Sequence, residues 1–220
     1  MTVTRVARLG LVNGYLVQED DGLTLIDTTL PRSSKQLLAA AERLGAPIVR
    51  IALTHAHGDH VGSLDELHER LPQAEVLITA RDARFLRGEK ELLPGESGKL
   101  RGSYPAVKTR PTREIAPGER VGSLEVVSAP GHTPGHVAFL DTRDRTLYCG
   151  DAYSTLGGTE TTARVNPRFP LPGIATWDRA VALESARALR ALEPARLAPG
   201  HGKVVEGPAA AMDAAIARAS

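Results

Sequence analysis

The chain has 220 residues, of which 42% are hydrophobic and 24% are charged, and its formal net charge is +1. This length can bury a substantial core. The balance of 27 basic against 26 acidic side chains argues against a nucleic acid partner, whose phosphates require clustered positive charge. No apolar run approaches the roughly 18 residues of a membrane span, and the N-terminus lacks the pattern of a secretory signal. With Cys149 as the only cysteine, no internal disulfide can form, and we expect a cytoplasmic protein.

The first half of the chain predicts strands that are followed by amphipathic helices. Alternating or continuous apolar patterns predict strands at residues 3–8, 14–18, 23–26, 48–53 and 76–78. Apolar residues on one helical face predict helices at residues 33–44, 63–70 and 81–86. Ser33 or Ser34 can cap the first of these helices, Gly45 can end it, and Ser63 can cap the second.

The second half repeats this order after an irregular stretch. Residues 88–111 contain scattered Gly, Pro and charged residues, which is typical of a mobile connection or a substrate rim. Strands are then predicted at residues 124–128, 136–140, 146–149 and 196–198, a long loop at 152–173, and helices at 177–192 and 208–217. Two batches of strands, each followed by helices, favour two packed sheets with helices outside over a doubly wound parallel sheet.

Residues 54–60 read Thr-His-Ala-His-Gly-Asp-His and directly follow a predicted buried strand. His55 and His57 project to the same side of an extended segment, so both can ligate one metal ion. Asp59 and His60, at the start of the next helix, would face a second position nearby. A polar loop with Asp59 as a helix cap would explain that carboxylate but would leave three histidines unexplained.

Further metal-ligating residues follow glycines at three other predicted strand ends, where a rigid scaffold presents functional groups. These pairs are Gly131-His132, Gly150-Asp151 and Gly200-His201. Seven candidate ligands are too many for one tetrahedral ion, but they suit two ions that share a carboxylate. They are His55, His57, Asp59, His60, His132, Asp151 and His201. His136 is an alternative to His132, whereas His68 is expected at the surface and Cys149 in the core.

This ordered set of motifs resembles the metallo-β-lactamase fold superfamily of metallohydrolases, in a short form similar to its glyoxalase II and lactonase branches. The resemblance covers residues 13–202 approximately. It implies an α/β fold, the αβ/βα four-layer sandwich, with the metals in a cleft at one edge of the two sheets. We expect residues 1–220 to form a single domain of this kind.

The resemblance also implies a role for each candidate ligand. The first metal would be held by His55, His57 and His132, the second by Asp59, His60 and His201, and Asp151 would bridge both. The match favours His132 over His136. Asp27, at an earlier strand end, also matches the family and would steady the His-rich loop from outside the metal shell. A simple turn residue after a strand would look the same in the sequence.

The predicted chemistry is hydrolysis. Nitrogen and carboxylate ligands are compatible with zinc, iron or manganese, and we expect two Zn²⁺ per chain. A water between two metals has its pKa lowered toward about 7, which provides a metal-bridging hydroxide at neutral pH. Asp59 could accept a proton from it and is the candidate catalytic residue. We expect cleavage of an ester-like bond, a thioester or a lactone, in a small molecule, with β-lactams and phosphodiesters as alternatives.

Departures from individual branches of the superfamily narrow this reading. Cys149 lies too early for the β-lactamases that use a cysteine ligand, and the chain ends 19 residues after His201, without the helical C-terminal region of glyoxalase II enzymes. Lactonases carry a tyrosine where this chain has Ser154. A mononuclear iron persulfide dioxygenase, which would use His55, His132 and Asp151, is the alternative from another reaction class.

The substrate pocket is expected to form from residues 28–30, 88–111 and 152–173. Tyr153 and Phe169 are candidate apolar walls that contact the substrate, although each could equally pack in the core or a loop. Only eight aromatic residues occur in the chain, so stacking on nucleobases is not indicated. Nothing in the sequence indicates the oligomeric state.

Overall fold

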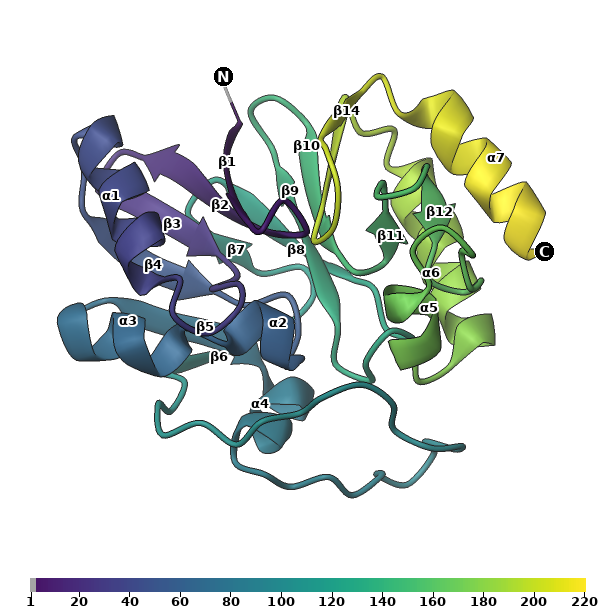
Figure 1. The fold of residues 1–220 in the computed structure, drawn as a ribbon, viewed down its shortest axis with the longest axis horizontal. Coiled ribbons are helices and arrows are strands. Elements are labelled where there is room, and N and C mark those ends of the chain that lie inside the picture. The colour runs from purple at the N-terminus through teal and green to yellow at the C-terminus, as the bar shows by residue number, and fades with distance from the viewer. Residues whose placement is uncertain (1–2) are drawn as a thin grey trace.

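A computed structural model describes residues 3–220. Within these residues two six-stranded sheets pack face to face, with helices covering the outer face of each sheet. Figure 1 shows α1 and α3 on one side of the sheets and α6 and α7 on the other. This arrangement confirms the predicted α/β sandwich of four layers.

The first sheet has the strand order β1-β2-β3-β4-β5-β6. Its strands β1–β3 pair antiparallel, whereas β3–β6 pair parallel. Parallel pairing of β3 with β4 aligns Leu25 with Ile51, so both strands end at the same edge of the sheet. The strands are Thr4–Arg8, Val12–Glu19, Gly22–Ile26, Ile48–Ala52, Glu75–Thr79 and Arg113–Ile115.

The second sheet has the order β14-β13-β10-β9-β8-β7, and in it only β10 and β13 pair parallel among the described strands. Its strands are β7 (Arg120–Val121), β8 (Leu124–Ser128), β9 (Val137–Asp141), β10 (Thr146–Gly150), β13 (Arg196–Pro199) and β14 (Val205–Glu206). A small ribbon is formed by β11 (Tyr153–Ser154) and β12 (Glu160–Thr161).

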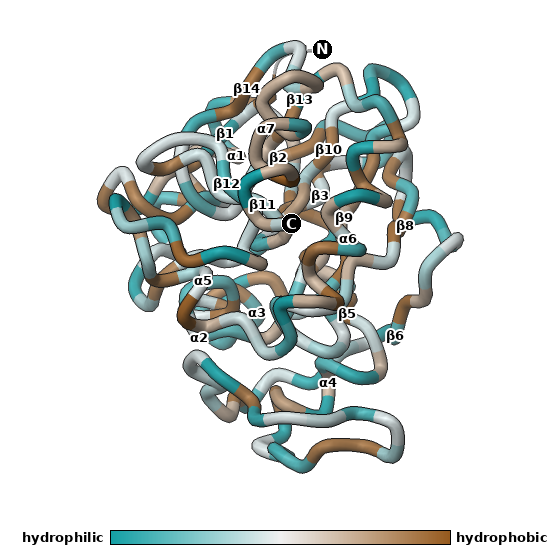
Figure 2. The backbone as a smooth tube through the Cα atoms, turned by 90° about the vertical axis from the view of Figure 1, so that its right-hand side faces the viewer, coloured by the Kyte–Doolittle hydropathy of each residue, from teal (hydrophilic) through white to brown (hydrophobic). Residues whose placement is uncertain are grey.

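Three apolar clusters hold these layers together. One fills the space between the sheets and includes Tyr15, Phe139 and Tyr148. A second lies between the first sheet and the helices α1 (Ser34–Leu44), α3 (Leu64–Arg70) and α4 (Ala80–Leu86). The third lies between the second sheet and the helices α6 (Arg179–Ala191) and α7 (Ala209–Ala219). Strands such as β8 are accordingly coloured hydrophobic over part of their length in Figure 2.

Several local expectations need correction. Neither Ser33 nor Ser34 caps α1 through its side chain, because Ser33 Oγ donates to Leu30 O and Ser34 Oγ donates to Glu66. Gly45 ends that helix in the left-handed conformation, as predicted. His68 is half-buried instead of fully solvated. The short strands β6, β7, β11, β12 and β14 lay outside the predicted elements.

Two small helices lie at the edge of the sandwich where β4 ends. These are α2 (Gly58–Val61), which follows β4 after a short loop, and α5 (Leu171–Ala175), which begins inside the predicted long loop of residues 152–173 and ends two residues beyond it. Residues 88–111 contain no helix or strand and form a lobe below α4 in Figures 1 and 2. No helix of residues 3–220 is long and apolar enough to cross a membrane.

Candidate metal centre

The candidate ligands lie at one edge of the sandwich, because several strands from both sheets end there. From the first sheet, His55 and His57 follow β4, and Asp59 and His60 lie on α2. From the second sheet, the ligands follow β8, β10 and β13, and they are His132, Asp151 and His201. The glycine–ligand pairs of the sequence thus converge from distant parts of the chain on one site.

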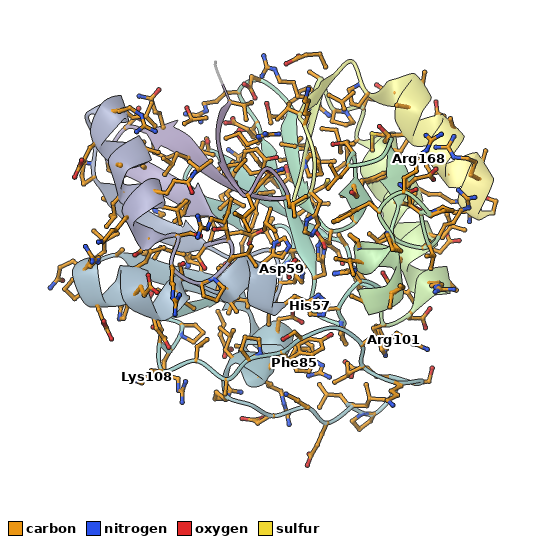
Figure 3. The ribbon with its side chains drawn as sticks, in the orientation of Figure 1. His57, Asp59, Phe85, Arg101, Lys108 and Arg168 are labelled. Carbon is orange, nitrogen blue, oxygen red and sulfur yellow. The ribbon has the colours of Figure 1, made fainter. Side chains whose placement is uncertain are left out.

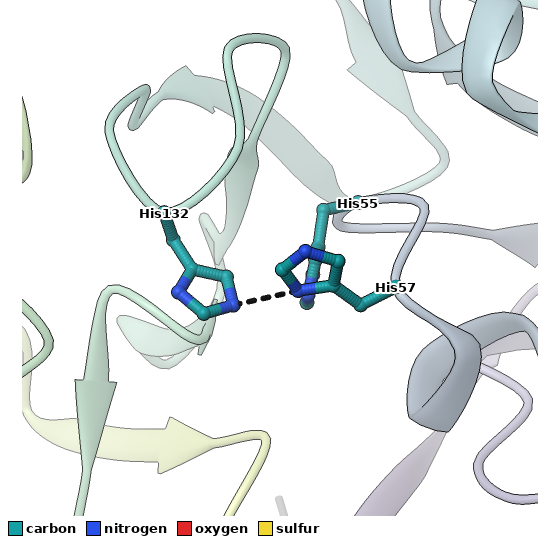
Figure 4. A group of neighbouring side chains, drawn as sticks. All are labelled: His55, His57 and His132. Carbon is teal, nitrogen blue, oxygen red and sulfur yellow. Dashed lines mark hydrogen bonds between the residues drawn. The ribbon is translucent and has the colours of Figure 1, made fainter. Parts of the chain in front are cut away.

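Three groups of side chains in this site could hold a metal ion, and in each group the ligand atoms lie within 4.8 Å of one another. The groups are His55 with His57 and His132, His55 with His60 and Asp151, and Asp59 with His60 and His201. Figure 4 shows the first group, with His57 and His132 facing each other from opposite sides. Together the groups contain all seven residues that the sequence singled out.

Asp151 lies between the group of His55, His57 and His132 and the group of Asp59, His60 and His201. These two groups are called the outer groups below. Its Oδ2 is 3.4 Å from His132 Nε2 and 3.1 Å from His201 Nε2, and its Oδ1 is 3.3 Å from His60 Nε2. Asp59 Oδ2 approaches His201 Nε2 at 3.3 Å. A carboxylate in this central position can offer one oxygen to each of two neighbouring ions.

The nitrogen on the far side of each imidazole ring is hydrogen-bonded to an acceptor outside the group. His57 Nε2–H donates to Arg101 O at 3.0 Å, and His201 Nδ1–H donates to Leu11 O at 2.9 Å. His60 Nδ1–H donates to Asp27 Oδ2 at 2.8 Å. Such bonds fix the ring orientation and leave the inner nitrogen free to ligate, as is usual for metal-binding histidines.

Two threonine hydroxyls complete this pattern. Thr54 Oγ1 donates to Asp27 and therefore accepts from His55 Nδ1–H at 2.9 Å. Thr176 Oγ1 donates to Pro172 O and therefore accepts from His132 Nδ1–H at 3.1 Å. Each hydroxyl thus selects the tautomer in which Nδ1 of its histidine partner carries the proton. Nε2 of His55 and Nε2 of His132, which face the site, then carry none.

Asp27 supports the site from beneath. It is buried at the end of β3, where its Oδ1 accepts from Thr54 N at 2.8 Å and its Oδ2 accepts from Thr54 Oγ1 and His60 Nδ1. Its backbone is left-handed, with φ of 58°. The carboxylate therefore holds the His-rich loop and the first turn of α2 in a fixed relation.

Asp82 is a second supporting carboxylate, and sequence reasoning missed it. It is fully buried on α4 and accepts from Ala56 N, Thr133 Oγ1 and Gly135 N at 2.7 to 2.9 Å. Burial is the largest influence on this group and raises its pKa to about 6. In the sequence Asp82 has the appearance of an ordinary acidic residue in the first helical turn, so only the fold shows its position.

Two other polar groups lie near the site without joining it. His136 Nε2 accepts the hydrogen bond of Asp151 N at 3.0 Å, so this nitrogen is engaged and helps to position the Asp151 backbone. Burial lowers the pKa of His136 to about 3, which keeps the ring neutral. Cys149 lies on β10 and is fully buried in the core, as expected.

Electrostatics divide the histidines into two sets. Burial lowers the pKa of His57 to about 4 and holds the pKa values of His55 and His132 well below the usual range. Burial also opposes protonation of His60 and His201, but nearby carboxylates, Asp151 above all, outweigh it. They raise the pKa of His201 to about 10 and that of His60 well above its ordinary value.

The two carboxylates of the site are ionised for the converse reason. Burial alone would raise the pKa of Asp151, but the imidazoles of His201 and His60 outweigh it and hold the pKa well below the ordinary value. Asp59 behaves in the same way, with His60 as its main stabilising neighbour. The site thus combines three neutral imidazoles, those of His55, His57 and His132, with two protonated imidazoles and two anionic carboxylates. Imidazole and carboxylate are donor types that bind zinc, iron and manganese.

The residues fit a metal ion. His55 Nε2 is buried and has no hydrogen-bond partner among residues 3–220. His60 Nε2 and Asp151 Oδ1 are likewise buried and, at 3.3 Å from each other, form no hydrogen bond. Leaving buried polar atoms unpaired is costly, and a metal ion within reach of these atoms would satisfy all of them.

A cavity of ≈ 310 Å³ opens directly onto this donor set. Its walls include Phe169, whose ring centroid lies 5.3 Å from that of His201, as the sequence led us to expect. Tyr153 is a correction. It is fully buried against α6, its hydroxyl donates to Ala186 O, and it does not line this cavity.

The irregular lobe of residues 88–111 packs against the His-rich loop. Ser103 O accepts from Gly58 N at 2.9 Å, and the ring of Tyr104 packs against those of His57 and Phe85. Figure 3 shows His57 and Asp59 where the two halves of the sandwich meet, with Phe85 below them. These contacts place the lobe beside the metal site, but none of its residues lines the cavity that Phe169 lines, so the predicted contribution of residues 88–111 to the substrate pocket is not seen here.

The fold and the arrangement of this site are those of a metallohydrolase. Residues 7–201 match the model of the metallo-beta-lactamase superfamily, and the chain belongs to this family. The predicted family is thereby confirmed.

Particular relatives agree with this placement. The chain is 44% identical over 210 residues to the uncharacterized protein YobT of Bacillus subtilis (strain 168), covering 94% of this chain and 90% of that protein. A hydroxyacylglutathione hydrolase of Synechococcus sp. (strain JA-2-3B'a(2-13)) is 35% identical over 140 residues, covering 62% of this chain but only 47% of that enzyme. The crystal structure of TTHA1623 in a di-iron-bound form aligns with a TM-score of 0.69 at 28% identity, covering 95% of this chain and 96% of that chain.

Proposed function

We propose that this protein is a dinuclear metallohydrolase that cleaves an ester-like bond, a thioester or a lactone, in a small molecule. The observation that carries the proposal is the convergence of seven donor side chains at one edge of the sandwich, five of which line one cavity, with every imidazole oriented by a hydrogen bond to an acceptor. Similarity to a hydroxyacylglutathione hydrolase over part of the chain supports the choice of reaction.

In this proposal each outer group holds one metal ion, with Zn²⁺ as the expected metal. The first ion is assigned to His55, His57 and His132, the second to Asp59, His60 and His201, and Asp151 is shared. When bound, such a pair of ions supplies an activated water nucleophile at neutral pH and polarises the oxygen of the scissile group. Because both sheets contribute ligands, we treat residues 1–220 as one catalytic domain.

The residues of the chain have distinct tasks. The Asp59 side chain is 35% exposed and lines the cavity, whereas that of Asp151 is 3% exposed. Asp59 Oδ2 is therefore the accessible position for a proton that leaves the attacking water. Because its pKa is held low, Asp59 is a weak base and a strong acid, so it passes this proton on to the leaving group.

A substrate panel and elemental analysis test the proposal together. Purified protein is assayed with a neutral thioester, a lactone, an aryl ester, a phosphodiester and a β-lactam, and its zinc, iron and manganese contents are measured. We expect about two zinc ions per chain and hydrolysis of the thioester or lactone. His57→Ala should reduce kcat/KM by about a hundredfold or more, whereas His68→Ala, a histidine outside the site, should not change it.

Three results would contradict the proposal. Retained activity in His57→Ala would remove the metal centre from the reaction. Hydrolysis of the β-lactam or phosphodiester alone would replace the substrate class. One iron per chain, with oxygen consumption on glutathione persulfide, would identify the persulfide dioxygenase instead.

A further inference from the structure

Outside the metal donor set, the cavity wall is entirely apolar. These residues come from the turn before β2, from the loop after β3 and from the segment around α5, and they are Leu11, Val12, Leu30, Phe169, Leu171, Pro172 and Ala175. The remaining lining residues are His57, Asp59, His132, Asp151 and His201, all from the donor set. One part of the cavity wall therefore consists of metal-ligating side chains, and the other part can contact only apolar groups favourably.

The apolar wall continues onto the surface at the mouth of the cavity. Within residues 3–220, the large hydrophobic side chains that are exposed are Leu9, Leu11, Leu171 and Ile174. All four lie on the turn before β2 or on α5, the two segments that contribute Leu11 and Leu171 to the cavity, and Leu171 is 64% exposed. Of these four residues, Leu11 and Leu171 line the cavity, whereas Leu9 and Ile174 do not. Exposed apolar side chains that line a cavity, as Leu11 and Leu171 do, indicate that an apolar ligand covers them.

The same lining also restricts the charge of the ligand. Neither lysine nor arginine is among the described residues that line the cavity, and the exposed Arg101 and Arg168 lie outside the lining. A carboxylate or phosphate on the distal part of a substrate would lose its hydration there and gain no partner. The apolar part of the cavity therefore disfavours ligands such as glutathione conjugates, because their glutathione part is charged.

We propose that the substrate carries an uncharged hydrocarbon chain beside its scissile bond, and that this chain lies between Leu11 and Leu171 against Phe169. This inference rests on the proposed hydrolase function and adds the substrate class to it. The hydrocarbon can belong to the acyl side or to the leaving group. The lining chemistry is the same in either case, so the experiment includes both series.

The first test varies chain length. Acyl thioesters of N-acetylcysteamine from acetyl to octanoyl form one series, and acetyl thioesters of linear alkyl thiols form the other. We expect kcat/KM to rise about fourfold per methylene in one series until the cavity is filled. The adipoyl thioester, in which a carboxylate replaces the terminal methyl group of the hexanoyl chain, should react about tenfold or more slowly than the hexanoyl thioester.

The second test changes the wall. Leu171→Asp adds a charge at an exposed position and should flatten the dependence on chain length. Ile174→Asp adds the same charge to the same helix, at a 51% exposed residue outside the lining, and should keep the dependence. Both side chains are largely exposed, so neither substitution removes core packing.

A third measurement does not need the metal or turnover. Octanamide, which has no ester bond, is titrated into metal-free protein by calorimetry. We expect binding with a negative heat-capacity change, weakened at least tenfold in Leu171→Asp and unchanged in Ile174→Asp.

The outcomes separate this inference from the proposed function. Hydrolysis without dependence on chain length in either series, or a preference for the adipoyl thioester, overturns the hydrocarbon site and leaves the hydrolase intact. If no ester is cleaved, the proposed function fails, and calorimetry alone decides. Octanamide binding that requires Leu171 then supports the site, and absence of binding overturns it.

Discussion

Thr133 Oγ1 donates a hydrogen bond of 2.7 Å to Asp82 Oδ2, and the same carboxylate oxygen accepts from Ala56 N at 2.9 Å. Ala56 lies between the ligands His55 and His57, and Thr133 follows the ligand His132. One buried carboxylate on α4 thus joins the two ligand loops that come from different sheets.

Asp82→Asn should loosen both loops. Both oxygens of Asp82 accept hydrogen bonds, so the NH₂ group of asparagine would point at one of these donors. At least one of the bonds from Ala56, Thr133 or Gly135 would therefore be lost. Loss of hydrogen bonds to a charged group costs about 1.5–3 kcal/mol of unfolding free energy. We expect urea unfolding to show a loss of this size, together with zinc affinity reduced about tenfold or more.

Asp65→Asn is the matched control for Asp82. Asp65 also accepts three hydrogen bonds, from Lys108 N, Thr109 N and Thr109 Oγ1, but they hold the lobe of residues 88–111 and no ligand loop. This variant should lose stability and keep its zinc affinity. Equal zinc affinities in the two variants would show that Asp82 has no positioning role.

Asp27→Asn tests the support of His60. Asparagine tolerates the left-handed backbone of Asp27, so the substitution adds little strain. Its amide would meet either His60 Nδ1–H or the Thr54 donors, donor against donor. We expect zinc affinity, measured by competition with a chelator, to fall about 10–100-fold. An unchanged affinity would mean that the Asp27–His60 bond does not orient this ligand.

The sequence was sufficient for the fold and for the ligand candidates because both depend on local order. A strand pattern followed by Gly and then His or Asp predicts a functional group at a sheet edge, as at Gly131-His132 and Gly200-His201. The edge then collects these groups, because the parallel strands β3 and β4, and likewise β10 and β13, end on the same side.

What the sequence could not supply depends on contacts between distant segments. Asp82 sits three residues after Thr79, the cap of α4, and its bonds to Ala56 and Gly135 exist only after the sheets have packed. Tyr153 is two residues from Asp151, which suggests a shared face. The chain instead turns over residues 149–152, where Ala152 N donates to Cys149 O, and the strand that begins at Tyr153 places this ring in the core.

The stability of the metal-free protein should be greatest near pH 6.5. Below this pH, His57 and His136, whose folded pKa values are about 4 and 3, stay neutral in the folded state but become protonated when unfolded. Protonation therefore favours unfolding, and stability falls as the pH falls. The pKa of Asp82 is raised to about 6, so protonation of this carboxyl group stabilises the folded state as the pH falls. This single contribution is outweighed by the buried imidazoles, which include His55 and His132.

The loss of stability at alkaline pH follows from the raised pKa of His201. Its folded pKa of about 10 lies above the unfolded value, so its stabilising contribution is complete below pH 6.5 and is lost as the pH rises toward 10. Urea unfolding of the metal-free protein from pH 5 to 10 measures both limbs. A midpoint that rises steadily through this range would contradict the assignment of these charges.

Metal binding should release protons from only one of the two outer groups. In the metal-free protein at pH 7, His60 and His201 are protonated because their pKa values are raised, whereas His55, His57 and His132 are neutral. A metal ion must displace the protons of its ligands. Zinc titrations in buffers of different ionisation enthalpy should give about two protons per chain, and release should persist in His57→Ala. A titration without proton release would refute this.

Gly200→Ala should disrupt the ligands around Asp151 while leaving the backbone conformation accessible. A Cβ atom at this position would lie 2.5 Å from His60 Cε1 and would overlap Asp151 Oδ1, so both side chains would have to move. We expect at least one metal ion per chain to be lost in elemental analysis, with a stability cost of about 1–3 kcal/mol from overpacking.

Gly45→Ala is the comparison for Gly200→Ala, because a Cβ atom at residue 45 would meet nothing within 4 Å. Gly45 has a φ of 71°, so this variant carries the strain of a left-handed alanine at the end of α1, a helix that contributes no candidate ligand. It should lose about 1 kcal/mol and keep its full metal content. Full metal content in Gly200→Ala as well would show that Asp151 and His60 can retreat without releasing an ion, and would argue against their assignment as metal ligands.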